Sequence, residues 1–221
     1  MRIDILTLFP EMFESLNASL IGKARENNKL EINIIDFREF SQNKHKKVDD
    51  YPFGGGAGML LQVQPLFDAV QSVKTPASKV ILLSPRGRVY NQSIVKEYAQ
   101  CEHLILVCGH YEGVDERFIE LCVNEELSVG DYVLTGGEIP AMIVADSVAR
   151  YIDGVLHNNE TTEEESFSNG LLEYPQYTRP QEFMGLKVPE VLLSGNHQQI
   201  KKWREEQSLK ITKLRRPDLL K

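Results

Sequence analysis

Short apolar runs alternate with segments of helical spacing along the first two thirds of the chain. Residues 3–8 and residues 30–36 each predict a strand. Between them, Pro10 opens a predicted helix that runs to about Glu26. The apolar positions of this helix fall on one face, at Met12, Phe13, Leu16, Leu20 and Ile21.

The same alternation continues further along the chain. Helices are predicted over residues 65–73 and 91–100, and strands over residues 80–83 and 103–107. Asn91 is a suitable N-cap for the second of these helices. Alternating strands and helices are typical of α/β proteins, so we expect a mostly parallel sheet with helices on both faces.

Residues 128–150, SVGDYVLTGGEIPAMIVADSVAR, form the stretch around which the rest of the chain is organised. Residues 128–134 alternate like a short strand, the TGG that follows allows a bend, and residues 138–150 have helical spacing with Pro140 in the first turn. Open α/β proteins bind ligands at such junctions. On these residues alone, an ordinary connection between a strand and a helix is an equally good interpretation.

Two earlier segments have the same order of features. Residues 104–117, LILVCGHYEGVDER, contain an apolar run, two glycines and a helix start, and residues 80–88 run from an apolar strand into a bend at SPRGR. No Walker loop occurs, and GGGAG at residues 54–58 is followed by methionine where the dinucleotide fingerprint needs its last glycine. GGGAG lies in a long loop, where it could cradle a phosphate or allow a tight bend.

The composition changes after Tyr151. Residues 157–169 contain four glutamates and neither lysine nor arginine, which is typical of a linker. The following segment has a predicted helix over residues 197–207, and a unit of about 50 residues is marginally stable alone. We therefore expect an α/β domain over residues 1–156, a flexible linker over residues 157–169 and a small helical domain over residues 170–221.

The charge is unevenly distributed along the chain. The net charge of −7 over 221 residues argues at first against a nucleic-acid partner. Residues 200–221 nevertheless hold eight lysines or arginines against three acids, and a second basic cluster comprises Arg38 and residues 44–47. Basic ends are compatible with an RNA held at the periphery, although either cluster alone is typical of a solvated surface.

The cysteines and the lengths of the apolar runs indicate the cellular compartment. Cys101, Cys108 and Cys122 are odd in number and lie in or beside apolar segments, which favours buried free thiols. No signal-peptide pattern and no run of about 18 apolar residues is present. We expect a cytoplasmic protein with no membrane partner.

Several motifs in one order carry a specific resemblance. SPRGR, CGHYEGVDER, SVGDYVLTGGE, GLLEYPQYTRP and VLLSGNH, together with MRIDILTLFPEMF at the start and LRRPDLL at the end, resemble the bacterial tRNA (guanine-N1)-methyltransferases of the SPOUT class. The resemblance implies methyl transfer from S-adenosylmethionine to N1 of guanosine 37 of tRNA, next to the anticodon. It also implies a homodimer with the active site at the subunit interface and a trefoil knot at about residues 84–138, which the hydrophobic pattern does not indicate.

The resemblance places the cofactor among the three bends. Apolar side chains would sandwich the adenine, and backbone groups at glycines would read its edge. The implied positions are Leu82, Leu83, Ser84, Pro85, Gly109, Tyr111, Glu112, Gly113, Val129, Gly130, Tyr132, Leu134, Gly136 and Gly137. Relatives also imply a weak Mg²⁺ requirement. The histidines and cysteines of this chain are not spaced as metal ligands are, so we expect no metal site formed by protein side chains alone.

Methylation of guanine N1 needs a base for the N1 proton and a cation for the charge that grows on O6. Arg150 offers a planar, permanently charged fork for the O6 edge, although an arginine at a helix C-terminus is also favoured by the helix dipole. In the family, a carboxylate 15 residues after the matching arginine is the proposed base, normally aspartate before Ser-Phe. Here that position is Glu165, one methylene longer, and Glu173 is the alternative base.

Contacts with the tRNA are expected at Ser166, Glu173, Arg179, Arg215 and Arg216. Gln176 stands where many relatives have histidine before Tyr-Thr-Arg-Pro, which weakens a role for an imidazole there. Two other functions remain open: a SPOUT methyltransferase acting on another RNA nucleotide, and a non-catalytic RNA-binding module. The presence of both Arg150 and an acid at position 165 favours catalysis.

Overall fold

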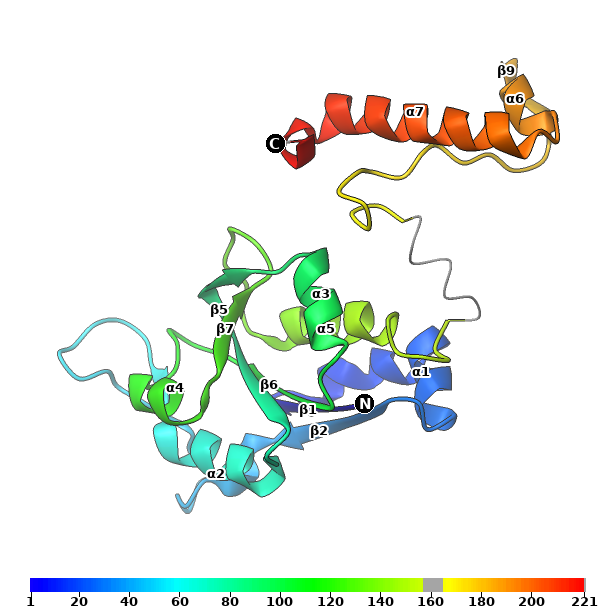
Figure 1. Cartoon of the computed structure of the whole chain (residues 1–221). Coiled ribbons are helices and arrows are strands. Elements are labelled where there is room, and N and C mark those ends of the chain that lie inside the picture. The colour runs from blue at the N-terminus through cyan, green and yellow to red at the C-terminus, as the bar shows by residue number, and fades with distance from the viewer. Residues whose placement is uncertain (157–164, 221) are drawn as a thin grey trace. The chain divides into compact units, whose positions relative to one another are not determined.

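The computed structural model describes residues 1–156 and 165–220 (Figure 1). The chain divides into two compact units, an N-terminal unit over Met1–His157 and a C-terminal unit over Asn158–Lys221. Residues 157–164 of the predicted linker lie outside the described residues, and its residues 165–169 are described as part of the C-terminal unit. Within the described part of the chain, no helix is both long enough and apolar enough to span a bilayer.

A five-stranded sheet forms the centre of the N-terminal unit. Its strand order is β2-β1-β6-β5-β7, and every neighbouring pair is parallel, which confirms the predicted parallel sheet. The strands are β1 (Arg2–Thr7), β2 (Glu31–Asp36), β5 (Ser78–Val89), β6 (His103–Cys108) and β7 (Glu125–Ser128). A separate antiparallel pair joins β3 (Asp49–Asp50) to β4 (Leu60–Leu61).

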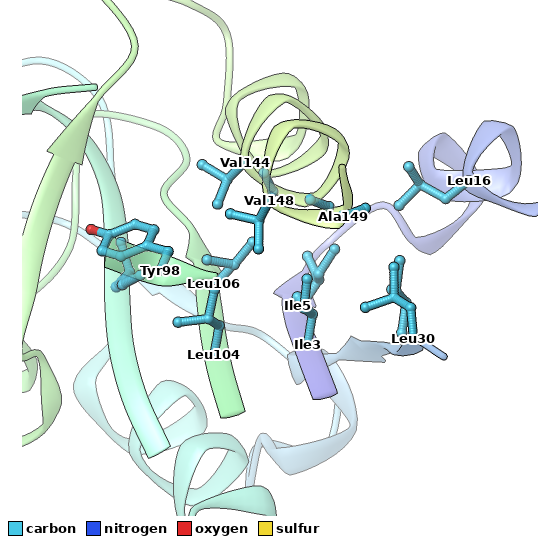
Figure 2. Packing of buried hydrophobic residues seen from close by; sticks show 14 of the residues in the cluster. Ile3, Ile5, Leu16, Leu30, Tyr98, Leu104, Leu106, Val144, Val148 and Ala149 are labelled. Atoms are coloured by element: carbon cyan, nitrogen blue, oxygen red, sulfur yellow. The ribbon is translucent and has the colours of Figure 1, made fainter. Parts of the chain in front are cut away.

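The two faces of this sheet bury two separate apolar clusters, because successive side chains of a strand point to opposite faces. Ile3 and Ile5 of β1 belong to the first cluster, in which Val144 and Val148 pack close to β6 (Figure 2). Leu6 belongs to the second cluster. The first cluster includes η1 (Pro10–Asn17), α1 (Ser19–Glu26), α3 (Gln92–Tyr98) and α5 (Glu138–Ala149), and the second includes η2 (Phe37–Phe40), α2 (Val63–Val73) and α4 (Glu116–Cys122).

The continuous helix expected from Pro10 to Glu26 is wrong. A 3₁₀ helix, η1, ends at Asn17, and α1 begins at Ser19, where φ is 56°. The two segments pack tightly, since a Cβ added to Gly22 would lie 2.2 Å from the Asn17 carbonyl oxygen. Apolar spacing predicted the buried face, but it could not reveal this break in the backbone.

The strand predicted over residues 128–134 is also wrong. β7 ends at Ser128, and Gly130 turns the chain with φ at 152°. The Ser128 hydroxyl stabilises this turn by accepting from the Gly130 amide at 3.2 Å. Val133 is 82% exposed, because the alternating residues belong to a loop rather than to a sheet.

The bend predicted at SPRGR takes a different form. β5 continues through Ser84–Arg88 to Val89, and only its pairing with β7 is interrupted, between Leu83 and Arg88. Asn91 caps α3 as predicted, with its side-chain oxygen accepting from the amides of Ser93 and Ile94. The strand is therefore irregular at this point but not ended.

The C-terminal unit is built around one long helix, α7 (His197–Arg215), which extends beyond the predicted residue 207. The Leu172 amide donates to the Thr212 hydroxyl at 2.9 Å, and the Arg204 guanidinium lies 4.7 Å from the centre of the Tyr174 ring. These contacts fix the irregular entry segment along the helix. The remaining elements are the hairpin β8 (Glu182–Phe183) and β9 (Leu186–Lys187), α6 (Glu190–Leu193) and η4 (Pro217–Leu220).

Candidate functional site

A cavity of about 520 Å³ lies where β6 and β7 end, beside the irregular part of β5. Its lining contains all fourteen positions at which the sequence resemblance placed cofactor contacts. They come from three segments of the chain, residues 82–85, 109–113 and 129–137. Their assignment to a ligand remains a prediction, but their convergence on one cavity is a property of the fold.

The first segment is held against β7 by a close backbone approach. A Cβ on Gly87 would lie 2.3 Å from the Leu127 amide nitrogen, so only glycine allows this contact. The Ser84 hydroxyl accepts from the Arg86 amide at 3.2 Å and shapes the same turn of the strand. The cavity wall at Leu83–Pro85 is therefore fixed by backbone packing.

The second segment follows β6 and is tied to the β4 region. The Glu112 amide donates to the Met59 carbonyl at 3.0 Å, and the Leu61 amide donates to the Gly113 carbonyl at 2.9 Å. Tyr111, at φ 58°, and Gly113, at φ 135°, turn this segment around the cavity. The end of the long glycine-containing loop is thereby attached to the cavity wall.

That loop has the bend that its glycines predicted. Gly54, Gly55, Gly56 and Gly58 all have positive φ, and no atom lies within 4 Å of a Cβ built on Gly54 or Gly55. Phe53, beside them, is fully exposed. The alternative, a phosphate cradle, stays a prediction.

The third segment crosses directly over the end of β6. The Gly137 amide donates to the Gly109 carbonyl at 2.9 Å, and a Cβ on Gly137 would lie only 2.6 Å from the Cα of Cys108. Gly136 forms an isolated antiparallel bridge with His110. The second and third segments thus support one another through their backbones.

Arg86 forms an ion pair across the rim of the cavity that the sequence did not indicate. Its guanidinium lies 3.2 Å from the Glu116 carboxylate of α4 and 3.1 Å from the Glu126 carboxylate of β7. Hydrogen bonding to Glu116 and the charge of Glu126 raise the pKa of Arg86. Residues 40 positions apart meet here only because β5 and β7 are neighbours.

Glu138, at the start of α5, is a second feature that the sequence did not reveal. Its carboxylate is 2% exposed and accepts a hydrogen bond from the Thr7 hydroxyl at 2.8 Å. The His110 Nε2 atom lies 3.6 Å from the other carboxylate oxygen. In the sequence, Glu138 resembled an ordinary acid in the first turn of a helix, and Thr7 lies 131 residues away.

Cys108 ends β6 beside Gly137, and its thiol is unreactive. Burial, with a smaller contribution from Glu138, raises the pKa of its thiol well above the ordinary value. The neutral thiol is thus a packing group. The prediction of buried free thiols is confirmed for Cys108 and Cys122, whereas Cys101 is free but only half-buried. Among the residues that the structure describes, no cluster of three or more His, Cys, Asp or Glu side chains could hold a metal ion.

The two predicted catalytic residues belong to separate units of the chain. Arg150 is the C-cap of α5 in the N-terminal unit, and Glu165 is the first described residue of the C-terminal unit. The structure groups Glu173 with Ser166, because the Glu173 amide donates to the Ser166 hydroxyl at 3.0 Å. The Gln176 side-chain amide also donates to the Glu173 carboxylate.

The predicted tRNA-binding arginines lie on the C-terminal unit. Arg215 ends α7 and Arg216 is its C-cap, whereas Arg179 precedes the hairpin β8–β9 and is exposed. Arg216 pairs with Asp218 at 2.7 Å and lies 5.7 Å from the centre of the Phe167 ring. The roles of these arginines in RNA binding stay predictions.

Comparison with known proteins agrees with the sequence resemblance. The family profile described as "tRNA (Guanine-1)-methyltransferase TrmD" matches residues 1–221. The chain is similar to the protein named tRNA (guanine-N(1)-)-methyltransferase of Geobacillus kaustophilus strain HTA426, with 58% identity over 223 residues that cover 100% of this chain and 91% of the relative. The protein of the same name from Clostridioides difficile strain 630 is 57% identical over 226 residues, which cover 100% of this chain and 98% of the relative. The chain belongs to the tRNA (guanine-1)-methyltransferase family.

Proposed function

We propose that this protein transfers a methyl group from S-adenosylmethionine to N1 of the guanosine at position 37 of tRNA. The observation that carries the proposal is the cavity of about 520 Å³ built from three strand-end segments. Its volume falls within the range of small-molecule sites, and its lining mixes apolar side chains with glycine backbone. The family supports the substrate and the reaction.

The cavity suits this cofactor chemically. Leu82, Leu83 and Leu134 offer apolar contact for a planar base, and the absence of side chains at Gly109 and Gly137 lets the backbone form that part of the wall. The fourteen contacts remain those implied by the resemblance. When bound, S-adenosylmethionine supplies an electrophilic methyl group on a sulfonium cation. Glu112, Glu116 and Glu126 line the cavity together with Arg86, which pairs with two of them, so carboxylates outnumber the guanidinium and the excess negative charge favours a cation.

Arg150 and Glu165 are the proposed catalytic residues. The Arg150 guanidinium would donate to guanine O6 and stabilise the negative charge that grows there as N1 loses its proton. The Glu165 carboxylate would accept the N1 proton, with Glu173 as the alternative base. Removal of this proton makes N1 the nucleophile, while Arg150 keeps the guanine ring oriented.

A homodimer with a composite active site is part of the same proposal. Ile139 and Ile143 of α5 and Met12 of η1 are exposed, and Val133 and Leu134 on the cavity loop are exposed as well. Exposed apolar side chains on α5, on η1 and on the loop that lines the cavity favour a protein interface. Glu165 of one subunit would then complete a site whose cofactor and Arg150 belong to the other.

The trefoil knot and the tRNA-binding role of the C-terminal unit are also proposals. The crossing of Gly137 over Cys108 supports a tightly threaded cofactor region. The basic residues of α7, among them Lys210, Lys213 and Arg215, support contact with phosphates. A cytoplasmic location accords with a tRNA substrate, and a weak Mg²⁺ requirement remains a prediction.

The decisive experiment is methyl transfer from labelled cofactor to an unmodified tRNA transcript, followed by mapping of the product. We expect one methyl group at N1 of guanosine 37. A matched transcript with adenosine at position 37 should accept no label. Methylation of another nucleotide would support a related SPOUT methyltransferase instead, and cofactor-independent RNA binding without transfer would support a non-catalytic module.

A further inference from the structure

Thr7 and Glu138 connect the start of the chain to the two segments that form the cavity wall. Thr7 ends β1, and its hydroxyl donates to the Glu138 carboxylate at 2.8 Å inside the protein. The same hydroxyl accepts from the Phe9 amide at 2.9 Å. Neither Thr7 nor Glu138 lines the cavity, so neither is placed to touch the ligand.

Both connections lead to His110, which does line the cavity. The Glu138 carboxylate lies 3.6 Å from His110 Nε2, and the Phe9 ring lies 5.1 Å from the His110 ring, centre to centre. His110 in turn bridges to the backbone of Gly136. A Cβ on Gly136 would lie 2.3 Å from Glu138 and 2.5 Å from His110, so these three residues are packed without spare room.

We propose that Thr7 and Glu138 are positioning residues that hold His110 and the bridged segments in the shape that binds the methyl donor. They set the affinity for the cofactor rather than the rate of methyl transfer. A buried carboxylate that loses a hydrogen bond turns toward any remaining donor or toward water. Here that movement would shift His110 and Gly136 together, and cofactor binding would have to restore them. The inference rests on the proposed cofactor site.

Thr7→Val tests the inference because valine has nearly the shape of threonine and lacks the hydroxyl. Calorimetry should show a loss of S-adenosylmethionine affinity of roughly 10-fold or more, the equivalent of one hydrogen bond to a buried charge. The turnover rate at saturating cofactor should stay near the wild-type value, so the change falls on KM. Thr7→Ser keeps the hydroxyl and should restore most of the affinity. Equal affinity in wild type and a folded Thr7→Val protein would refute the proposal.

Val148→Ala is the control for a merely structural effect. Val148 is buried in α5 away from the cavity, so its truncation lowers thermal stability without removing any contact of His110. We expect its cofactor affinity to match the wild type. If Val148→Ala and Thr7→Val lose affinity in proportion to their loss of stability, the positioning role is wrong.

Two further measurements distinguish positioning from a charge effect. S-adenosylhomocysteine lacks the sulfonium charge, and positioning predicts that Thr7→Val weakens both ligands equally. A loss confined to S-adenosylmethionine would show that the variant acts through the charge of Glu138 and would overturn the proposal. In a double-mutant cycle, Thr7→Val and His110→Ala together should cost no more than the larger single change, because both act through one contact. Additive losses would also contradict it.

Failure of the proposed function would look different. If the wild-type protein binds neither S-adenosylmethionine nor S-adenosylhomocysteine, the cavity is not the cofactor site. If the wild type binds both and the Thr7 variants bind equally well, only the positioning role is wrong.

Discussion

The two units of the chain differ in how much apolar surface they bury. The N-terminal unit has one apolar cluster on each face of its sheet, whereas Thr212 is the only fully buried residue among the described residues of the C-terminal unit. Met184 and Leu186 in the β8–β9 hairpin are 87% and 79% exposed. A unit with so little core is marginally stable alone. The proposed cofactor cavity thus lies in the well-packed unit, while the proposed base lies in the sparsely packed one.

The largest effect is expected where the sparsely packed unit would contribute chemistry. Glu165→Gln keeps the shape of the side chain and removes its basicity, so single-turnover methyl transfer should fall by about 10²-fold to 10⁴-fold. Cofactor affinity should stay unchanged, because the cavity belongs to the N-terminal unit. Rapid-quench kinetics and calorimetry measure the two quantities.

Two matched variants sharpen this assignment. Glu165→Asp restores the usual residue of the family and should retain much of the activity. Glu173→Gln should cost less than Glu165→Gln if Glu173 only supports the site through its bond with Gln176. A severe defect in Glu173→Gln beside a near-normal Glu165→Gln would transfer the role of base to Glu173.

Core truncation tests the difference in packing directly. Leu106→Ala, in the middle of the central strand β6, should lower the free energy of unfolding of the N-terminal unit by about 2–5 kcal/mol. Leu186→Ala, on the exposed hairpin of the C-terminal unit, should change stability by no more than about 0.5 kcal/mol. Denaturant titrations of both variants check this, and equal losses would contradict the comparison.

Glycine substitutions probe how closely each unit is packed. Gly137→Ala should weaken S-adenosylmethionine binding roughly 10-fold, because its Cβ would lie 2.6 Å from backbone at Cys108 and the wall must shift. Gly170→Ala is the matched change in the C-terminal unit. Its Cβ meets open space, although its φ is +72°, so it should cost about 1 kcal/mol of backbone strain and leave cofactor binding intact. Isothermal calorimetry on both proteins separates these outcomes.

The smallest effect concerns the basic end of α7. Arg215→Ala should reduce the slope of log affinity for tRNA against log salt by about 0.7 to 0.9, the value for one phosphate contact. Arg216→Ala should change the slope less, because Asp218 at 2.7 Å already compensates its charge. Filter-binding titrations over a range of salt measure both slopes. If neither variant changes slope or affinity, this end of the helix is simply a solvated surface.

Much of the fold could be predicted because periodicity reports burial directly. The strands at residues 3–8 and 103–107 and the N-cap Asn91 were readable from local chemistry, and the motifs identified the positions that converge on the cavity. Periodicity failed at residues 128–134, where exposed apolar side chains on a loop imitate a strand. The contacts of Arg86 and Glu138 could not be predicted, since they depend on which strands become neighbours.

The place of β1 within the sheet has a consequence for how the protein folds. β1 pairs with β2 on one side and with β6 on the other, so Arg2 lies opposite both Glu31 and His103. The second pairing joins residues about a hundred positions apart, and contacts of that separation slow folding because a long loop must close first. During synthesis, one edge of this apolar strand has no partner until β6 has emerged from the ribosome. The early chain therefore offers an open strand edge on which we expect chaperones to act.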